Sequence, residues 1–306
     1  MDYSDGSAAT VRVPGKINLA LRCGPRRPDG YHSLATVFQA VSVFDEVSAR
    51  RAAPGHFGLT IRGSASPFLP EGDDNLAIKA ARLLARWSGY EKRIGVELVI
   101  DKAIPVAAGM AGGSADAAAT LLACTALWDL DADHNELAAL GAELGADVPF
   151  CLRGQVALGV DRGDNLAPVL TRGTYHWVLA IGEGLSTAAV FARFDEMYPG
   201  GTSPLEVDRA ILNALAQGNA EALGAALVND LQPAALNLRP DLVRIRQAGL
   251  DLGALGAVVS GSGPTIAFLC ADETAAIDIC VGMSSMGVGA NLLRVYGPVP
   301  GARLLV

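Results

Sequence analysis

Three glycines and a serine lie between an alternating stretch and a long run rich in Ala and Leu. They are Gly109, Gly112, Gly113 and Ser114, within Pro105-Val-Ala-Ala-Gly-Met-Ala-Gly-Gly-Ser-Ala-Asp-Ala-Ala-Ala119. Glycine lets a ligand approach the backbone closely, and Ser114 is a suitable N-cap for a helix whose free N–H groups attract anions, above all phosphates. We expect a phosphate-binding loop, with a tight turn before a capped helix as the alternative. The spacing matches neither a Walker A motif nor a Rossmann fingerprint.

Lys16 and Asn18 are polar residues in a strand that otherwise looks buried. Alternation over residues 10–21 places both side chains on one face, opposite Ile17 and Leu19. An edge strand with one solvated face is the commoner explanation. The functional alternative is that both side chains point into a polar cleft.

An aromatic pair follows a turn signal close behind this strand. Tyr31-His32 comes directly after Pro-Asp-Gly and shortly after Arg26-Arg27. A lone Tyr or His is usually structural or merely exposed. A Tyr-His pair beside two arginines could hold a flat ring and an anionic group.

Asp147 and Asn75 each have a capping explanation and a functional one. Asp147 is the one acid in the apolar stretch 146–151, where it is either an N-cap or turn former, or a carboxylate held as a base or metal ligand. Asn75 belongs to the acidic start of a predicted helix over 76–87, and a capping Asn near a ligand can also contact that ligand. Residues 260–263, Ser-Gly-Ser-Gly, offer hydroxyl and N–H groups for a second anion-binding turn.

The totals of the chain limit its class. Its 306 residues are 51% hydrophobic and 18% charged, which favours a packed core over disorder. With a net charge of −8 and no basic cluster, we expect no nucleic-acid partner, and phosphate binding would need local positive charge from a few Lys or Arg, helix dipoles and a metal ion. Five scattered cysteines without Cys-x-x-Cys, no signal-peptide pattern and no bilayer-length apolar run predict a cytoplasmic protein without a membrane partner.

Strand and helix patterns alternate along the chain and predict an α+β protein. We expect a domain junction just before Thr174, giving domains 1–172 and 173–306, the second an antiparallel sheet with helices on one face. Strands are expected at 10–21, 36–44, 45–50, 59–62, 95–101, 155–160, 174–181, on both sides of 260–264, and at 291–296. Helices are expected at 76–87, after the glycine loop to Trp128, and at 134–144, 187–197, 205–217, 220–228, 240–248 and 272–286.

Three stretches together resemble the signature motifs of the GHMP kinase family, which includes galactokinase, homoserine kinase and mevalonate kinase. They are Pro14-Gly-Lys-Ile-Asn-Leu, the glycine stretch 105–119, and Ser260-Gly-Ser-Gly-Pro264, in that order and over nearly the whole chain. The resemblance implies a two-domain fold, with an N-terminal domain like ribosomal protein S5 domain 2, a C-terminal ferredoxin-like domain, and the active site in the cleft between them.

Within the family, Arg27-Pro-Asp-Gly-Tyr-His-Ser-Leu34 followed by Thr36-Val-Phe38 resembles the branch that phosphorylates cytidine-diphospho-methylerythritol on its 2-hydroxyl, in the non-mevalonate isoprenoid pathway. This implies ATP and Mg²⁺ as co-substrate and metal, a small-molecule acceptor, and a monomer or weak homodimer. The alternatives are another small-molecule kinase of the family, such as homoserine or mevalonate kinase, or a non-catalytic nucleotide-binding relative. Asp29-Gly-Tyr-His32 argues against the first alternative, and the presence of Lys16 and Asp147 against the second.

The resemblance also implies roles for single residues. Lys16 and Asp147 match catalytic positions, Tyr31 would stack on cytosine and His32 would hydrogen-bond it. Ser114 is the candidate Mg²⁺ ligand. The ATP-binding candidates are Pro105, Val106, Ala107, Ala108, Gly109, Met110, Ala111, Gly112, Gly113, Ser114, Ala115 and Asn75. The substrate-binding candidates are Asn18, Tyr31, His32, Asp147, Phe191 (a second ring for the cytosine), Ser260, Gly261, Ser262 and Gly263.

The glycine loop departs from the usual family pattern at two positions. Ala111 stands where a glycine is common, and Ala115 where a serine is common. Ala111 must therefore avoid positive φ or accept strain.

Overall fold

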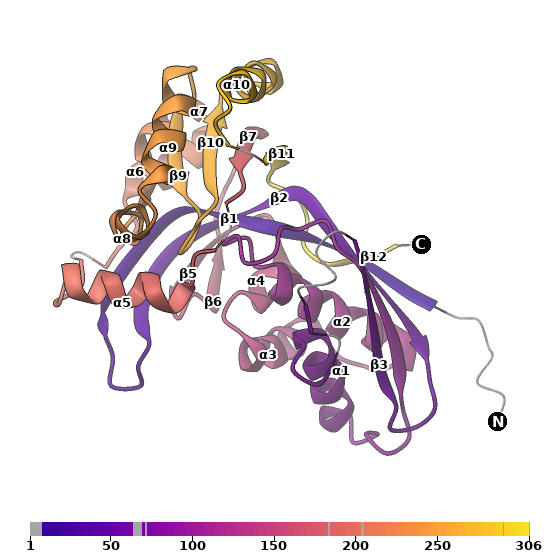
Figure 1. Ribbon diagram of the computed structural model, residues 1–306. Helices are drawn as coiled ribbons and strands as arrows, with labels where there is room; N and C mark the ends of the chain where they lie inside the picture. Colours follow the sequence, from indigo (N-terminus) through magenta and orange to yellow (C-terminus); the bar gives the residue numbers. More distant parts are fainter. Residues whose placement is uncertain are drawn as a thin grey trace.

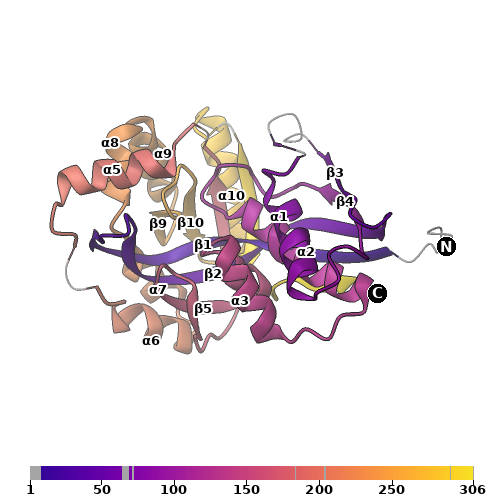
Figure 2. The ribbon, with the colours of Figure 1, turned by 90° about the horizontal axis from the view of Figure 1, so that it is seen from below.

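A computed structural model describes residues 8–63, 69–70, 72–182, 184–202, 205–289 and 291–305. Within these residues the chain forms two lobes, each built on its own β-sheet (Figure 1). The first and last described residues, Ala8 and Leu305, lie at the same end of the molecule (Figures 1 and 2). None of the helices in the described part of the chain has the length and apolar character that a membrane crossing needs.

Two long antiparallel strands, β1 (Ala8–Arg26) and β2 (His32–Arg51), form the backbone of the first sheet and extend into the other lobe (Figures 1 and 2). Strand β1 extends the one strand expected over 10–21, and β2 merges the two expected at 36–44 and 45–50. Bulges at Pro14/Gly15, Asn18/Ala20 and Cys23/Arg26 let β1 bend without ending. The order is β12-β1-β2-β4-β3, with β5 on β2, β6 on β5, and β8 parallel to β1. The other strands are β3 (Phe57–Arg62), β4 (Val96–Asp101), β5 (Val156–Asp161), β6 (Asn165–Pro168), β8 (Val228–Asn229) and β12 (Arg303–Leu305).

Four helices accompany this sheet: α1 (Leu76–Trp87), α2 (Gly112–Trp128), α3 (His134–Leu144) and α4 (Val148–Arg153). Helix α1 spans the predicted residues, and the side chain of Asn75 caps it by accepting from the N–H of Ala77. Helix α2 packs on β1 and β2, with alanines buried around it. Small alanine side chains let its backbone come close to the sheet, so the loop before α2 is held rigidly against β1.

The second sheet has the order β11-β7-β10-β9, and all its pairs are antiparallel, as predicted. Its strands are β7 (Tyr175–Ala180), β9 (Gly256–Val259), β10 (Ile266–Cys270) and β11 (Leu292–Gly297). The associated helices are α5 (Thr187–Met197), α6 (Arg209–Gln217), α7 (Ala220–Ala226), α8 (Gln232–Leu238), α9 (Asp241–Asp251) and α10 (Glu273–Ser285).

The expectation that helices cover one face of this sheet is wrong. Along β10, Ala267 and Leu269 join the core that contains α6 and α7, while Ile266 and Phe268 join the core that contains α9 and α10. Both faces are therefore covered. Strands β9 and β10 are buried on both faces, and the sequence pattern alone does not show which helices lie on which side.

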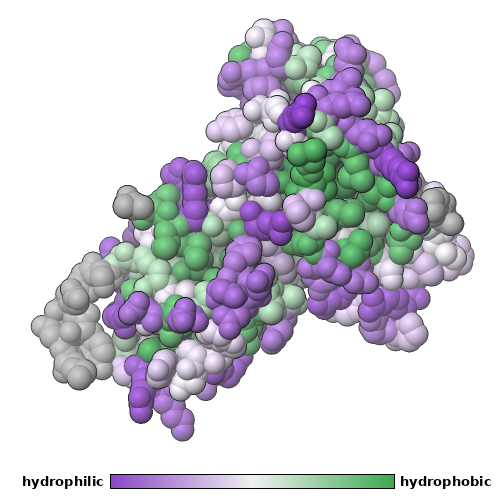
Figure 3. Space-filling view, turned by 180° about the vertical axis from the view of Figure 1, so that it is seen from behind, coloured by the Kyte–Doolittle hydropathy of each residue, from purple (hydrophilic) through white to green (hydrophobic). Residues whose placement is uncertain are grey.

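The predicted boundary at 172/173 falls between β6 and β7. The two halves are nevertheless interleaved, because β8 and β12, both from the second half, pair with β1. Figure 3 shows apolar residues gathered in patches over both lobes of the rear face, with hydrophilic residues around and between these patches.

Candidate active site

A cavity of about 510 Å³ lies where the two lobes meet. Its wall combines the first strands, the glycine loop, the start of α5 and the turn between β9 and β10. The sequence candidates that line it are Lys16, Asn18, Pro105, Ala107, Ala108, Gly109, Ala111, Gly112, Gly113, Ser114, Asp147, Phe191, Gly261, Ser262 and Gly263.

Lys16 and Asp147 meet in this cavity. The Lys16 Nζ lies 3.6 Å from Asp147 Oδ2 and donates a 2.8 Å hydrogen bond to Asn18 Oδ1. Asn18 Nδ2 in turn donates to Thr36 Oγ1 at 2.8 Å, and this bond fixes the orientation of the Asn18 amide. The Lys16 side chain is only 6% exposed, whereas that of Asp147 is 33% exposed. The polar-cleft alternative therefore holds for Lys16 and Asn18, and the solvated-edge explanation does not.

Asp147 occupies the N-cap position of α4, but its side chain makes no capping hydrogen bond. Its carboxylate is thus left to face the cavity and Lys16. It is half-buried rather than fully buried, and can be reached by a substrate hydroxyl.

The glycine loop ends in a helix start that differs from the expected one. Helix α2 begins at Gly112, with Ala111 at the N-cap position in the left-handed region at φ 60°. The prediction that Ser114 caps the helix is wrong, because Ser114 lies inside its first turn and no side-chain cap bond is made. Ala111 accepts the strain of positive φ. The first N–H groups of α2 consequently have no side-chain cap and are available to an anion at the cavity wall.

Gly109 holds the loop against the second lobe. Ser260 Oγ donates to the Gly109 carbonyl at 3.1 Å, and the Lys16 N–H donates to the Met110 carbonyl at 3.2 Å. A Cβ at Gly109 would lie 2.3 Å from the Ser260 carbonyl oxygen, and φ there is +73°. Only glycine fits this crossing point, which brings the loop beside Lys16.

The turn between β9 and β10 lines the cavity through Gly261, Ser262 and Gly263. Ser260 is fully buried and bonds to the glycine loop instead. Asn229 fixes the turn by donating to the carbonyls of Val259 and Gly261, each at 2.7 Å.

Of the three residues that the resemblance assigns to cytosine, only Phe191 belongs to the lining of the cavity. Tyr31 is 59% exposed, and His32 is buried beside α5. Phe191 lines the cavity and stacks on the His32 imidazole, with ring centroids 4.9 Å apart.

Four of the ATP-binding candidates do not line the cavity: Asn75, Val106, Met110 and Ala115. The side chain of Asn75 is used by the N–H of Ala77 and the carbonyl of Pro70. Its capping role is therefore shown, and Leu76 beside it lines the cavity instead. Met110 and Ala115 are fully buried in the core.

Sequence reasoning missed Arg162 and Thr187. Arg162, in the turn between β5 and β6, lines the cavity and pairs with Asp164 at 2.5 Å. Together with Lys16 it supplies the cationic side chains found in the described lining. Thr187 at the start of α5 bonds Ser262 Oγ at 2.9 Å. The Asp-Arg-Gly-Asp turn could have drawn attention to Arg162, but no local pattern in the sequence indicates where this turn lies.

A buried charge cluster lies beneath the glycine loop. The Lys102 Nζ donates to Asp45 Oδ2 at 2.5 Å, to Asp116 Oδ2 at 2.9 Å and to the Gly112 carbonyl at 3.3 Å. Asp45 also accepts from the N–H groups of Ala103 and Ile104 at 2.7 and 2.9 Å. The cluster thereby ties both ends of the loop, before Pro105 and after Ala111, to strand β2.

Burial raises the pKa of Asp116 from 3.8 to about 8, opposed by the charge of Lys102 and aided by that of Asp45. The extra proton stabilises the folded state fully below pH 3.8, and this stabilisation is lost as pH rises through about 8. We expect Asp116→Asn to lack this loss. Urea unfolding at pH 5, 7 and 9 would measure the free energy of unfolding of both proteins. The value for the variant should rise relative to that of the parent protein up to about pH 8 and should rise no further above it. Parallel pH profiles for the two proteins would contradict the assignment.

The residues present fit a metal ion that arrives with a nucleotide. In the described part of the chain no group of three or more His, Cys, Asp or Glu side chains is arranged to hold a metal. Mg²⁺ retains water and phosphate ligands and needs few protein groups. Ser114 on the first turn of α2 and Asp147 both line the cavity where such phosphates would lie.

Family models and known proteins match this chain over most of its length. The model described as the GHMP kinases N terminal domain matches residues 75–155, and that of the GHMP kinases C terminal matches residues 211–289. A curated relative from Thermobifida fusca, named 4-diphosphocytidyl-2-C-methyl-D-erythritol kinase, is 49% identical over 98% of this chain and 99% of its own. A relative of the same name from Mycobacterium avium is 48% identical over 99% and 98%.

Solved structures agree with these matches. A crystal structure of a 4-(cytidine 5'-diphospho)-2C-methyl-D-erythritol kinase is 33% identical, with a TM-score of 0.74 over 94% of this chain and 98% of that one. A homoserine kinase from Cytophaga hutchinsonii, 19% identical, has a TM-score of 0.72 over 99% and 98% and shares the fold. With both family models matched and close relatives covering nearly all of it, this chain belongs to the GHMP kinase family.

Proposed function

We propose that this protein is a 4-diphosphocytidyl-2-C-methyl-D-erythritol kinase, which transfers the ATP γ-phosphoryl group to the 2-hydroxyl of the cytidyl alcohol in isoprenoid precursor synthesis. The observation that carries the proposal is the Lys16–Asp147 pair, 3.6 Å apart, in a cavity walled by a helix start suited to phosphates. Relatives of that name, about half identical over nearly their full length, support the choice of acceptor.

The reaction needs positioning and charge neutralisation more than covalent help, because the transition state of phosphoryl transfer is loose. Asp147 would accept or orient the proton of the substrate hydroxyl, as its half-exposed carboxylate permits. Lys16, held by Asn18, lies beside Asp147 and would stabilise the negative charge that develops between them.

The nucleotide phosphates would lie at the start of α2, where the uncapped N–H groups and the helix dipole favour negative charge. Arg162, which pairs with Asp164, is a second cationic side chain in the lining. When bound, Mg²⁺ supplies neutralisation of the phosphate oxygens, and Ser114 is its candidate protein ligand. Pro105, Ala107, Ala108 and the glycines of the loop shape this wall.

The cytidine end of the acceptor would lie near Tyr31, His32 and Phe191, at the margin of the cavity. Phe191 is a ring already on the wall, and Tyr31 is exposed and free to stack. We further propose that the enzyme is cytoplasmic, since all five cysteines are free thiols. We also propose that it is a monomer or a weak homodimer.

Tyr31→Ala should raise the KM for the cytidyl substrate with little change in kcat or in the KM for ATP. Losing one base–aromatic stack costs roughly 1–3 kcal/mol, about five- to 150-fold in KM. Steady-state kinetics with each substrate varied would measure this. Tyr90→Ala, at an exposed tyrosine outside the lining of the cavity, is the matched control. An unchanged KM for the cytidyl substrate in Tyr31→Ala would reject the stacking role.

The function itself is tested by ADP release with ATP, Mg²⁺ and 4-diphosphocytidyl-2-C-methyl-D-erythritol, with homoserine and mevalonate as parallel acceptors. We expect turnover with the cytidyl alcohol alone. Turnover of another acceptor instead would retain a kinase and reject this substrate, and silence with all three by a folded protein would favour a binding function.

A further inference from the structure

Helix α5 presents three side chains to His32 from successive turns of one face. Phe191 stacks on the imidazole with an interplanar angle of 26°, and Phe194 meets it edge-on at 6.1 Å. Asp195 Oδ1 lies 2.7 Å from His32 Nε2. The two phenylalanines fix the plane of the ring, and Asp195 fixes its rotation within that plane.

The hydrogen bond to Asp195 also decides which ring nitrogen carries the proton. An ionised carboxylate only accepts, so Nε2 must be the donor. In the neutral imidazole Nδ1 is then an acceptor. Among the residues that the structure describes, Nδ1 has no hydrogen-bond partner, and it is not completely buried. It is therefore free to accept a hydrogen bond from a ligand.

His32 lies beside the binding cavity. Phe191, which stacks on His32, and Leu34, two residues along β2, both line that cavity. Under the proposed function, the remainder of the site holds phosphate groups and a flat ring. A free acceptor on His32 matches a base that offers an N–H donor at its edge.

We propose that Asp195 is a positioning residue that makes His32 select cytosine over uracil. It does so by holding Nδ1 as an acceptor for the exocyclic amino group of cytosine. Uracil presents a carbonyl oxygen at the same place, and two acceptors facing each other repel. The inference rests on the proposed function for the identity of the substrate, while Asp195 itself matches no motif in the sequence.

The test compares binding of CDP and UDP to the full chain by calorimetry, so that it does not depend on turnover. The parent protein should prefer CDP about tenfold, as expected for one good hydrogen bond against one mismatch. Asp195→Ala should lose most of this preference through weaker CDP binding, with ATP affinity unchanged. In a His32→Ala background the same substitution should have no further effect on the ratio, because Asp195 acts through His32.

Nitrogen NMR of the imidazoles at pH 8 gives a second readout. His32 should be the Nε2–H tautomer in the parent and a mixture of tautomers in Asp195→Ala. The matched control is Glu97→Ala, since the exposed pair His56 Nε2–Glu97 Oε1 at 2.8 Å has the same chemistry far from the cavity. It should alter only the His56 signal and leave the CDP/UDP ratio intact.

An unchanged CDP/UDP ratio in Asp195→Ala, or a doubly protonated His32 in the parent at pH 8, would overturn the inference. The proposed function fails separately, if the parent protein does not turn over the cytidyl alcohol. A preference for CDP that depends on Asp195 would stand even then.

Discussion

Asp147→Asn should lower kcat by about 10³-fold, within the range attributed to a positioned general base, while ATP affinity stays within a few-fold. Asparagine keeps the shape of the side chain and removes both the proton acceptor and the negative charge opposite Lys16. Because Asp147 makes no capping bond in α4, the fold should not depend on its charge. Single-turnover kinetics would show the loss in the chemical step, and nucleotide titration would show retained binding.

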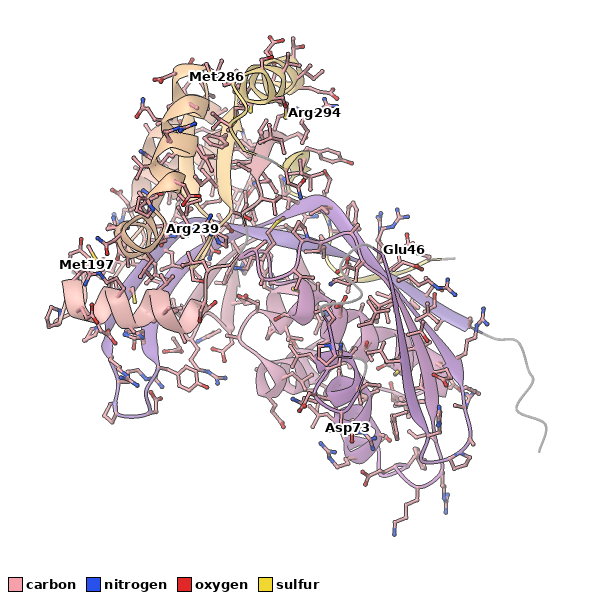
Figure 4. All side chains as sticks on the ribbon, viewed as in Figure 1. Glu46, Asp73, Met197, Arg239, Met286 and Arg294 are labelled. Atoms are coloured by element: carbon pink, nitrogen blue, oxygen red, sulfur yellow. The ribbon has the colours of Figure 1, made fainter. Side chains whose placement is uncertain are left out.

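Asp73→Asn is the control for loss of one carboxylate. Asp73 lies on the surface of the first lobe (Figure 4), where its side chain is 80% exposed and pairs with Arg82. Its activity should equal that of the parent protein. Near-native kcat in Asp147→Asn would refute the role of Asp147, and equal loss of ATP binding and of kcat would point to a damaged phosphate site instead.

Lys102→Met should lower the free energy of unfolding by about 3–5 kcal/mol, the cost of leaving the buried carboxylate of Asp45 without its charged partner. The Lys102 side chain is 2% exposed, and Asp45 and Asp116 are 0% and 5% exposed. Methionine fills similar volume, so the loss reports charge rather than a cavity. Urea unfolding at pH 7 would measure it.

Two further variants separate this effect from general damage. Lys79→Met removes an exposed lysine that lies 3.9 Å from Asp74 and should change stability by less than about 1 kcal/mol. Lys102→Met combined with Asp45→Asn should regain part of the loss, because the buried carboxylate left without its partner is then gone, while the amide oxygen can still accept from the N–H groups of Ala103 and Ile104. A Lys102→Met protein as stable as the parent would mean that the cluster does not hold the loop.

The orientation of α5 shows how the second lobe takes part in the site. The helix starts at Thr187 beside the cavity and ends at Met197, at the outer end of that lobe (Figure 4). Phe191 and Asp195, on adjacent turns, therefore face the tip of the β1–β2 hairpin, where His32 lies. Contacts between residues about 160 positions apart in the chain define this part of the site.

The amino-acid sequence by itself determined the elements whose signals are local. Alternation placed Lys16 and Asn18 on one face, the glycine stretch predicted a loop before a helix, and Asn75 marked the start of α1. Each of these depends on residues a few positions apart, and turn, capping and strand preferences act over that range. The three family motifs also stand in the sequence, and the matched family confirms the kinase fold that they implied.

Only the tertiary structure decided which distant segments share an environment. Helix α2 starts at Gly112 and not at Ser114, because Ala111 takes positive φ at the end of the loop. Ser260 binds this loop through the carbonyl of Gly109. The tertiary structure also placed helices on both faces of the second sheet, and it joined Lys102 to Asp45, 57 positions away. Burial and charge pairing arise when segments pack, and a buried aspartate and an exposed one have the same letter in the sequence.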